Sequence, residues 1–179
     1  RSARSGASRW RSSVDHTMAL PRGSPERHTS VSRRGKSVEL LTLPVEKRKD
    51  AAARAEAINS ADAVILCLPD AAAIEAAALV SPDNDATVLI DASTAHRCNP
   101  GWAYGFPELN AGQRSSIAAS KRIANPGCYA TGFIALTAPL VGAGLLRPSA
   151  ALVASAVSGY SGGGKPLIGI FEGDEPHEP

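Results

Sequence analysis

Short apolar runs alternate with alanine-rich stretches between residues 38 and 93, and this alternation constrains the fold more than any other feature. The apolar runs, which are typical of strands covered on both faces, are "VELLTLPV" (38–45), "ADAVILCLPD" (61–70) and "ATVLIDAS" (86–93). The stretches between them have the composition of helices and are "EKRKDAAARAEAINS" (46–60) and "DAAAIEAAALV" (70–80). The order predicts an α/β fold, a Rossmann-like doubly wound parallel sheet with right-handed crossovers.

The second half of the chain is less regular. Residues 94–114 are predicted to be loop, whereas residues 119–146 predict a short strand, an Asn-Pro-Gly turn and a helix from about Cys128, with Pro139 as a kink or stop. The segment "ALVASAVSGYSGGGK" (151–165) predicts one more strand that runs into a glycine-rich loop. We expect three parts: a disordered basic extension (1–36), an incomplete Rossmann-like dinucleotide-binding domain (37–115) and the start of a truncated α+β catalytic and dimerisation domain (116–179).

The charge is divided unevenly along the chain. Residues 1–36 hold nine Lys and Arg against two Asp and Glu, and the remainder holds ten against fifteen. A basic arm suits binding to nucleic acid or to an anionic surface, and it equally suits a disordered extension. Because its charges are scattered, it has one aromatic (Trp10) and no apolar periodicity, we expect disorder and no nucleic-acid partner.

Cysteine usage and hydropathy predict the compartment. The three cysteines form no CxxC pair and no zinc-ligand spacing, which predicts free thiols, a reducing environment and no metal site. The apolar runs are too short to span a membrane, and the charged first residues are not followed by the apolar core of a signal peptide. We therefore expect a cytoplasmic protein without a membrane partner.

Cys128 stands at a junction that favours thiol chemistry, within "NPGCYATGF" (125–133). A helix that begins there presents unpaired N–H groups and a partial positive charge, which favour a thiolate and can hold an oxyanion. Gly127 leaves space for a substrate beside the sulfur. The alternative, a small buried residue, suits Cys67 inside "VILCLP" better, and Cys98 is expected to be an exposed loop thiol. Position alone leaves both interpretations of Cys128 open.

Two further segments predict ligand contacts. In "SGYSGGGK" (158–165), glycines let backbone amides approach an anion or a flat ring, although a flexible hairpin has the same composition. The segment "DASTAHR" (91–97) leaves a buried strand at its carboxyl end, where open α/β sheets bind ligands. There Arg97 suits a carboxylate or phosphate, with a hydroxyl of Ser93 or Thr94 beside it; His96, a lone loop histidine, is expected to be structural or solvated.

Four motifs, in this order and spacing, resemble the shorter bacterial type of the N-acetyl-gamma-glutamyl-phosphate reductase family: "DASTAHR", "GWAYGFPELN", "NPGCYATGFIAL" and "SGYSGGGK". That family belongs with the aspartate-semialdehyde dehydrogenases. The resemblance runs from about residue 38 to about residue 173. It implies an oxidoreductase of arginine biosynthesis, which uses NADPH to reduce N-acetyl-glutamyl 5-phosphate to the semialdehyde and releases phosphate through a cysteine thioester.

The resemblance also implies roles for matching residues. The family's nucleophile corresponds to Cys128, the expected catalytic residue. The expected contacts to NADPH/NADP are Leu68, Pro69, Ser158, Gly159, Ser161, Gly162 and Gly163. The expected contacts to the small-molecule acyl phosphate are Ser93, Arg97 and Asn125. The complete enzyme is expected to be a homo-oligomer.

The sequence departs from the family pattern near both ends. The family opens with a strand and a glycine-rich turn that holds the cofactor pyrophosphate, but Gly6, Gly23 and Gly35 are isolated and follow no apolar strand. The family's general acid/base histidine comes from a segment after residue 179, and His177 matches no motif. We expect an incomplete form without activity of its own. The alternatives are a related semialdehyde dehydrogenase acting on another acyl phosphate, and an inactive fragment that only binds a partner or ligand.

Overall fold

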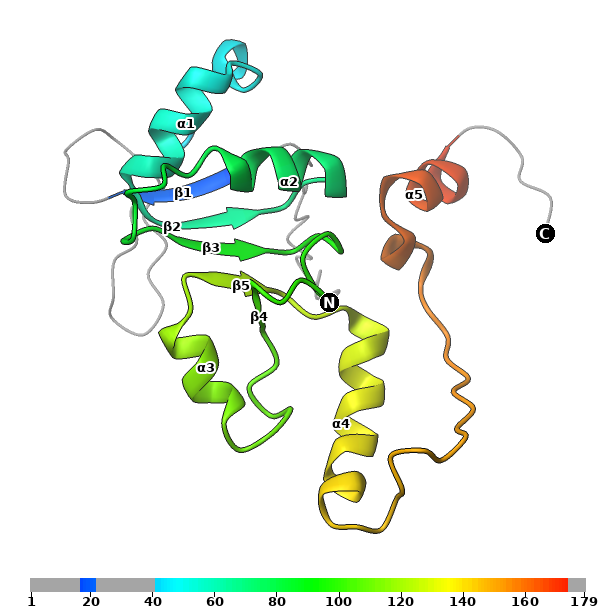
Figure 1. Cartoon of the computed structure of the whole chain (residues 1–179). Helices are drawn as coiled ribbons and strands as arrows, with labels where there is room; N and C mark the ends of the chain where they lie inside the picture. The colour runs from blue at the N-terminus through cyan, green and yellow to red at the C-terminus, as the bar shows by residue number, and fades with distance from the viewer. Residues whose placement is uncertain (1–16, 22–40, 174–179) are drawn as a thin grey trace, which may run out of the picture. The chain divides into compact units, whose positions relative to one another are not determined.

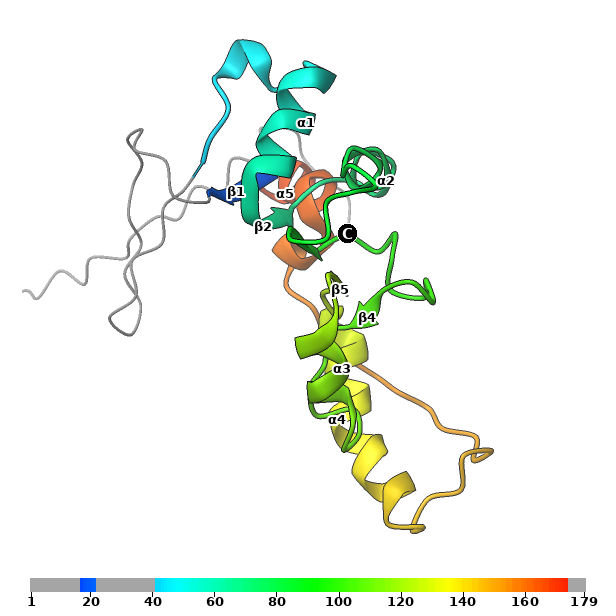
Figure 2. The same ribbon diagram turned by 60° about the vertical axis from the view of Figure 1, so that its left-hand side comes forward.

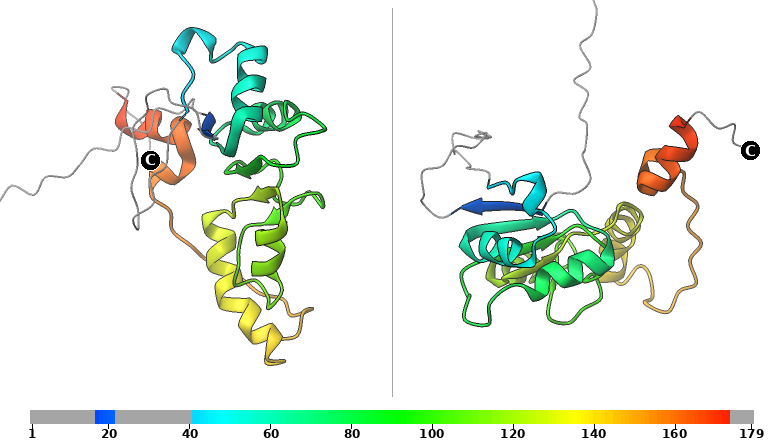
Figure 3. Two further views of the ribbon diagram at one scale, coloured as in Figure 1. Left: turned by 90° about the vertical axis from the view of Figure 1, so that its left-hand side faces the viewer. Right: turned by 90° about the horizontal axis from the view of Figure 1, so that it is seen from above.

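The computed structural model describes residues 17–21 and 41–173, and the chain divides into two compact units, Arg1–Thr131 and Gly132–Pro179. The described strands of the first unit are β1 (Thr17–Pro21), β2 (Ala61–Leu66), β3 (Val88–Asp91), β4 (Ala103–Tyr104) and β5 (Arg122–Ala124). Its helices are α1 (Ala51–Ser60), α2 (Asp70–Ala78) and α3 (Gln113–Ala119). Figure 1 shows the strands stacked in the order β1-β2-β3-β5-β4, with α1 and α2 toward one end of the stack and α3 toward the other. The turned views keep this grouping (Figure 2, Figure 3).

Four strands of the sheet are parallel and end at the same level. Leu66 at the end of β2 pairs with Asp91 at the end of β3, and Asp91 pairs with Ala124 at the end of β5. Ala124 in turn pairs with Tyr104 at the end of β4. The prediction of an α/β fold with a parallel sheet is therefore confirmed, and the segments that leave these strands emerge side by side at one edge.

Alanine-rich helices cover one face of this sheet. The core contains Ile58 of α1, Val64 and Leu66 of β2 and Leu89 of β3, all fully buried, together with small alanines of α2. Burying each large side chain contributes roughly 1.5–3 kcal/mol. Helix α1 begins later than predicted because Asp50 caps it: the Asp50 carboxylate accepts the amides of Ala52 and Ala53 at 2.8 and 3.0 Å.

The first strand differs from the expectation of a disordered extension over residues 1–36. Five of those residues, Thr17–Pro21, form β1 and pair with β2 in antiparallel register. A strand there covers N–H and C=O groups that an open edge of β2 would expose. The other residues of 1–36 lie outside the described part of the chain, and the domain boundaries near residues 36 and 115 stay predictions.

The strand predicted over residues 38–45 is wrong for its described part. Residues 38–40 lie outside the described residues, Leu41 forms a single bridge, and Val45–Lys47 is the short 3-10 helix η1. Pro44 has no N–H to give to a sheet ladder. The loop prediction for 94–114 missed β4, which is only two residues long and therefore too short for any periodicity, and α3, which starts within that range.

Helix α4 (Cys128–Gly142) begins where the sequence predicted, at Cys128. Pro139 does not stop it, since the helix continues to Gly142. The helix has no buried residue in the structure, although it is strongly apolar. Its exposed large side chains are Tyr129, Phe133, Leu136, Leu140 and Val141.

The second unit does not contain the strand predicted within residues 151–165. Residues 151–159 are irregular, and Val153 and Val157 are 99% and 100% exposed. A strand needs a neighbour for its backbone groups, and no described residue of this unit pairs with the segment. The glycine-rich part forms the 3-10 helix η2 (Tyr160–Gly163) and runs into helix α5 (Gly164–Glu172) instead of forming a loop. Tyr160 joins the two helices, because its hydroxyl donates to Glu172 at 2.6 Å.

Candidate active site

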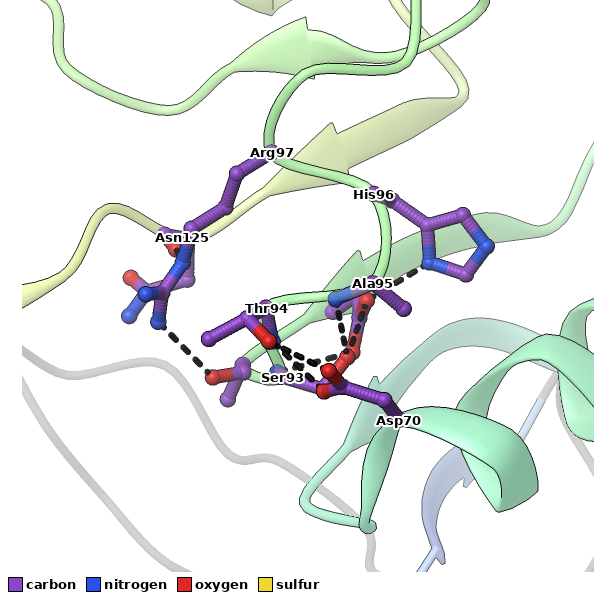
Figure 4. A network of polar contacts seen from close by, with 9 residues as sticks. Asp70, Ser93, Thr94, Ala95, His96, Arg97 and Asn125 are labelled. Atoms are coloured by element: carbon purple, nitrogen blue, oxygen red, sulfur yellow. Dashed lines mark hydrogen bonds and ion pairs between the residues drawn. The ribbon is translucent and has the colours of Figure 1, made fainter. Parts of the chain in front are cut away.

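The candidate site lies at the edge where the parallel strands end. Residues 67–69, 92–97 and 125–128 leave β2, β3 and β5 there. Figure 4 shows the polar network at this edge, with Arg97 beside Asn125, and Thr94 beside Asp70. Three segments far apart in the sequence are thus brought together, as expected for ligand sites of open α/β sheets.

Asp91 is the residue of the network that contacts both Ser93 and His96. It ends β3, is fully buried, and accepts the Ser93 amide on Oδ1 at 2.9 Å. Its Oδ2 accepts the Ser93 hydroxyl at 2.7 Å and lies 2.6 Å from Nδ1 of His96. A buried carboxylate requires donors, so the hydrogen-bond pattern assigns a proton to Nδ1 of His96. Sequence reasoning missed Asp91, although a charged residue closing the apolar run "VLID" was a signal.

His96 is buried, so of the two alternatives expected for it, structural or solvated, the solvated one is wrong. The residue is 6% exposed, and its ring stacks on the indole of Trp102 with centroids 4.0 Å apart and planes 15° apart. Trp102 in turn packs against the hydrophobic core. The ring is therefore held on two sides, by a carboxylate and by an aromatic face.

Arg97 reaches across two strand ends. Its Nε donates to the main-chain oxygen of Asn125 at 3.0 Å and its Nη2 to that of Ala92 at 3.3 Å. Its Nη1 faces Gly127: a Cβ on that glycine would lie 2.7 Å from Nη1, closer than real contacts allow. The structure thus brings together two of the three expected substrate-binding residues, Arg97 and Asn125, next to Cys128.

Cys128 is exposed and is the first residue of α4. The first turn is closed by Thr131, whose amide and hydroxyl donate to the oxygen of Gly127 at 2.9 and 2.7 Å. The earlier amides of a helix have no partner within it and point toward whatever lies at its start. The thiol, the guanidinium and these amides therefore share one small region.

The other two cysteines are also exposed. For Cys98 this matches the expectation of a loop thiol. For Cys67 the expectation of a buried strand residue is wrong, because β2 ends at Leu66 and Cys67 follows it at the sheet edge. Partial burial of the thiol, and next the negative charge of Asp91, raise the pKa of Cys67 above its ordinary value.

Asp70 is a second carboxylate that the sequence analysis did not select. It begins α2 and accepts the Thr94 amide at 2.9 Å and also the Thr94 hydroxyl. The hydroxyl bond first, and the amide bond next, hold the pKa of Asp70 below its usual value. Asp70 thereby ties the start of α2 to the loop after β3.

The remaining expected site residues fall into two groups. Leu68, which packs against the core, and Pro69, which precedes α2, lie at the sheet edge. Ser93 lies there too, but its hydroxyl donates to Asp91 and accepts the Ala95 amide at 3.2 Å. The expected cofactor contacts that belong to the second unit are Ser158, Gly159, Ser161, Gly162 and Gly163.

Over residues 17–21 and 41–173, no helix is both long enough and apolar enough to cross a membrane. Within the same ranges, no three or more His, Cys, Asp or Glu side chains are grouped in a way that could hold a metal ion.

Two protein-family models match the chain. "Semialdehyde dehydrogenase, NAD binding domain" matches residues 24–117, and "Semialdehyde dehydrogenase, dimerisation domain" matches residues 128–175. No solved structure matches.

Several curated relatives are named N-acetyl-gamma-glutamyl-phosphate reductase. The chain is 54% identical to that of Chelativorans sp. (strain BNC1) over 138 residues, which are 77% of this chain and 44% of the relative. It is 53% identical to that of Mesorhizobium japonicum over 131 residues, 73% of this chain and 42% of the relative. It is 55% identical to that of Burkholderia orbicola over 135 residues, 75% and 42% respectively. The chain thus spans less than half the length of these relatives.

Proposed function

Because the chain belongs to the semialdehyde dehydrogenase family, we propose that it carries the nucleophile of an N-acetyl-gamma-glutamyl-phosphate reductase. The reaction is the reduction of N-acetyl-glutamyl 5-phosphate to the semialdehyde, with NADPH as reductant and release of phosphate, in arginine biosynthesis. The relatives that bear this name support the choice of substrate. The observation that carries the proposal is the placement of Arg97 against Gly127, directly before the exposed Cys128 at the start of α4.

The chain's own residues account for the acyl-transfer half of the reaction. The Cys128 thiolate attacks the acyl carbon, the bond from that carbon to the phosphate oxygen breaks, and a thioester and free phosphate result. The unpaired amides of the first turn of α4 stabilise the oxyanion that forms on the way. The guanidinium of Arg97, held by Asn125 and Ala92, offers a positive charge to the phosphate before and after it leaves.

The residues present fit part of the nicotinamide cofactor. Leu68 and Pro69 offer an apolar side chain and a ring at the strand ends, which suit the flat nicotinamide or its ribose. In residues 41–173, no strand runs through a glycine-rich turn into a helix, the arrangement that would hold a pyrophosphate. When bound, NADPH supplies the hydride that reduces the thioester. Ser158, Gly159, Ser161, Gly162 and Gly163 stay proposed contacts to the cofactor.

We assign Ser93 a supporting role. Its hydroxyl is already shared between Asp91 and the Ala95 amide, and the residue is only 8% exposed. We propose that Ser93 holds the Arg97 loop and that Arg97 and Asn125 contact the acyl phosphate.

We propose that the complete enzyme is a homo-oligomer and that its other partner is the small-molecule acyl phosphate. We propose the cytoplasm as its location. The match of residues 128–175 to a dimerisation domain supports self-association. The exposed apolar side chains of α4, among them Tyr129, Phe133 and Leu136, support it as well. The alternatives stay a related semialdehyde dehydrogenase acting on another acyl phosphate and an inactive fragment that only binds a partner or ligand.

Acylation of the thiol by a reactive acyl phosphate tests the proposal. Incubation with N-acetyl-glutamyl phosphate or acetyl phosphate, followed by peptide mass spectrometry, should give an acyl adduct on Cys128. The adduct on residue 128 should be absent in Cys128→Ser and retained in Cys98→Ser. Cys98→Ser is a matched control because Cys98 is also exposed. Equal acylation of all three thiols would contradict the proposed nucleophile. A preference for another acyl phosphate would favour the related dehydrogenase.

A further inference from the structure

We infer that His96 is a positioning residue for Arg97: its bond to Asp91 fixes the loop that holds the guanidinium beside Cys128. The inference rests on the proposed anion-binding role of Arg97 and adds a residue to it. His96 directly precedes Arg97, is 6% exposed, and has its Nδ1 2.6 Å from Asp91 Oδ2. Because the His96 ring is buried, we expect it to affect Arg97 through its contact with Asp91 and not by touching a ligand.

The anchor of this loop is Asp91, because β3 is held on both sides. Asp91 pairs with Leu66 of β2 and with Ala124 of β5. Its carboxylate accepts hydrogen bonds from the Ser93 amide, the Ser93 hydroxyl and the His96 ring nitrogen. The next five residues of the chain therefore fold around this carboxylate. Figure 4 shows this turn, with His96 and Arg97 leaving the loop on different sides.

The wrapped loop presents Arg97 in a defined position. Two of its nitrogens bond the main-chain oxygens of Asn125 and Ala92, and Nη1 faces Gly127. An arginine side chain has many rotamers, and ordering them opposes anion binding. The bonds to Asn125 and Ala92 restrict those rotamers, and they can form only when the backbone at Arg97 is in place. The contact of His96 with Asp91 fixes that backbone, so it contributes to the charge placed next to Cys128.

Two contacts of His96 can be separated by substitution. His96→Asn keeps an N–H donor near the place of Nδ1 and removes the ring that stacks on Trp102 at 4.0 Å. His96→Phe keeps an aromatic ring and removes the donor to Asp91. If the donor positions Arg97, the asparagine variant behaves like the parent protein and the phenylalanine variant like a protein without the Arg97 charge.

The readout is the ratio of Cys128 alkylation rates with iodoacetate, an anion, and with iodoacetamide, which is neutral. Changes in intrinsic thiol reactivity largely cancel in this ratio, and peptide mass spectrometry reads Cys128 alone. Loss of one charge near the sulfur in Arg97→Gln should lower the ratio about two- to fivefold. His96→Phe should lower it by a similar factor and His96→Asn should not. Arg114→Gln, which removes an exposed arginine paired with Glu108 at 3.4 Å, is the charge-matched control and should leave the ratio unchanged.

The outcomes separate the two proposals. An unchanged ratio in Arg97→Gln would overturn the anion-binding role of Arg97 itself. A lowered ratio in Arg97→Gln with the parent ratio in a folded His96→Phe would overturn only the role of His96. A fall in His96→Asn, with the parent ratio in His96→Phe, would assign the effect to the stacked ring and overturn the role of the donor. If His96→Phe does not fold, as judged by circular dichroism, His96→Leu decides: it also lacks the donor to Asp91, and the parent ratio there overturns the role of His96.

Discussion

The guanidinium of Arg97 donates from Nε to the main-chain oxygen of Asn125 at 3.0 Å and thereby joins the loop after β3 to the turn before α4. This bond links residues 28 positions apart in the sequence. It places a positive charge beside the start of a helix that begins with a thiol.

Gly127→Ala should displace Arg97, because a Cβ at that position would lie 2.7 Å from Nη1. We expect acylation of Cys128 by an acyl phosphate to slow about two- to fivefold, the effect of moving one charge in a solvated site. Gly132→Ala is the matched control, since a Cβ there meets nothing within 4 Å. It should keep the acylation rate and raise stability by roughly 0.5–1 kcal/mol, because alanine favours the helix interior. Equal acylation rates in the two variants would contradict the prediction.

The three thiols should differ in alkylation rate at neutral pH. Cys128 lies at a helix start, where the unpaired amides stabilise a thiolate, so we expect it to react fastest. Cys67 should react slowest although it is exposed, because its raised pKa leaves less thiolate. The Cys67 rate should keep rising with pH above the ordinary thiol pKa. Brief iodoacetamide treatment and peptide mass spectrometry measure all three; equal rates for Cys98 and Cys128 would leave exposure as the sole explanation.

Stability should fall in acid through Asp70. Its folded-state pKa is lowered by the Thr94 bonds, so its contribution is fully present above the unfolded pKa and is lost as the pH falls through the folded value. Asp70→Asn should therefore lower the free energy of unfolding at pH 7 and flatten its decrease below about pH 4. Asp83→Asn, an exposed aspartate after α2, is the control and should keep the acid slope. Urea titrations at several pH values decide between these outcomes.

Asn59→Ala should destabilise the opposite edge of the first unit. The Asn59 side chain donates to the oxygens of Ala55 and Leu79 at 2.8 and 2.9 Å and accepts the Ser81 amide at 2.8 Å. Loss of these bonds should cost about 1–3 kcal/mol, since each net bond contributes roughly 0.5–1.5 kcal/mol. Asn110→Ala, which removes a single exposed bond to the Gly112 amide, should cost less. Equal urea midpoints for the two variants would show that the Asn59 network contributes little.

Much of the first unit could be predicted from the sequence because its central strands are short apolar runs, although only alternate residues of them, such as Val64 and Leu66 of β2, are buried. An apolar run such as "AVIL" has few other stable conformations, and the start of α4 followed from the Pro-Gly turn before Cys128. The bonds of Asp91 could not be predicted, since their partners depend on how the loop folds back on the strand. The segment at residues 151–159 fails for a different reason: its apolar residues predict a strand, but the described residues offer no second strand to pair with it.

The family prediction is confirmed by the two matches to semialdehyde dehydrogenase domains. The cofactor contacts proposed at Ser158, Gly159 and residues 161–163 follow only from the resemblance. The resemblance implied that Arg97 and Asn125 contact the acyl phosphate, and this stays a prediction; the fold brings the two residues together, because both follow strands that end at the same edge.

The last prediction is that this chain alone shows no detectable NADPH-dependent reduction of N-acetyl-glutamyl phosphate. It spans less than half the length of its curated relatives, and within residues 41–173 no strand leads through a glycine-rich turn into a helix that could hold a pyrophosphate. A positioned general acid/base contributes about 10²–10⁴-fold, and none of the site residues assigned above is proposed for that role. Acylation of Cys128 should still proceed slowly, because it needs only the thiolate, the helix amides and Arg97. The measurement is the decrease in NADPH absorbance as the nicotinamide is oxidised, with Cys128→Ser as the blank. Oxidation above that blank would mean that residues outside the described ranges complete the site, and the proposal of an incomplete enzyme would then be withdrawn.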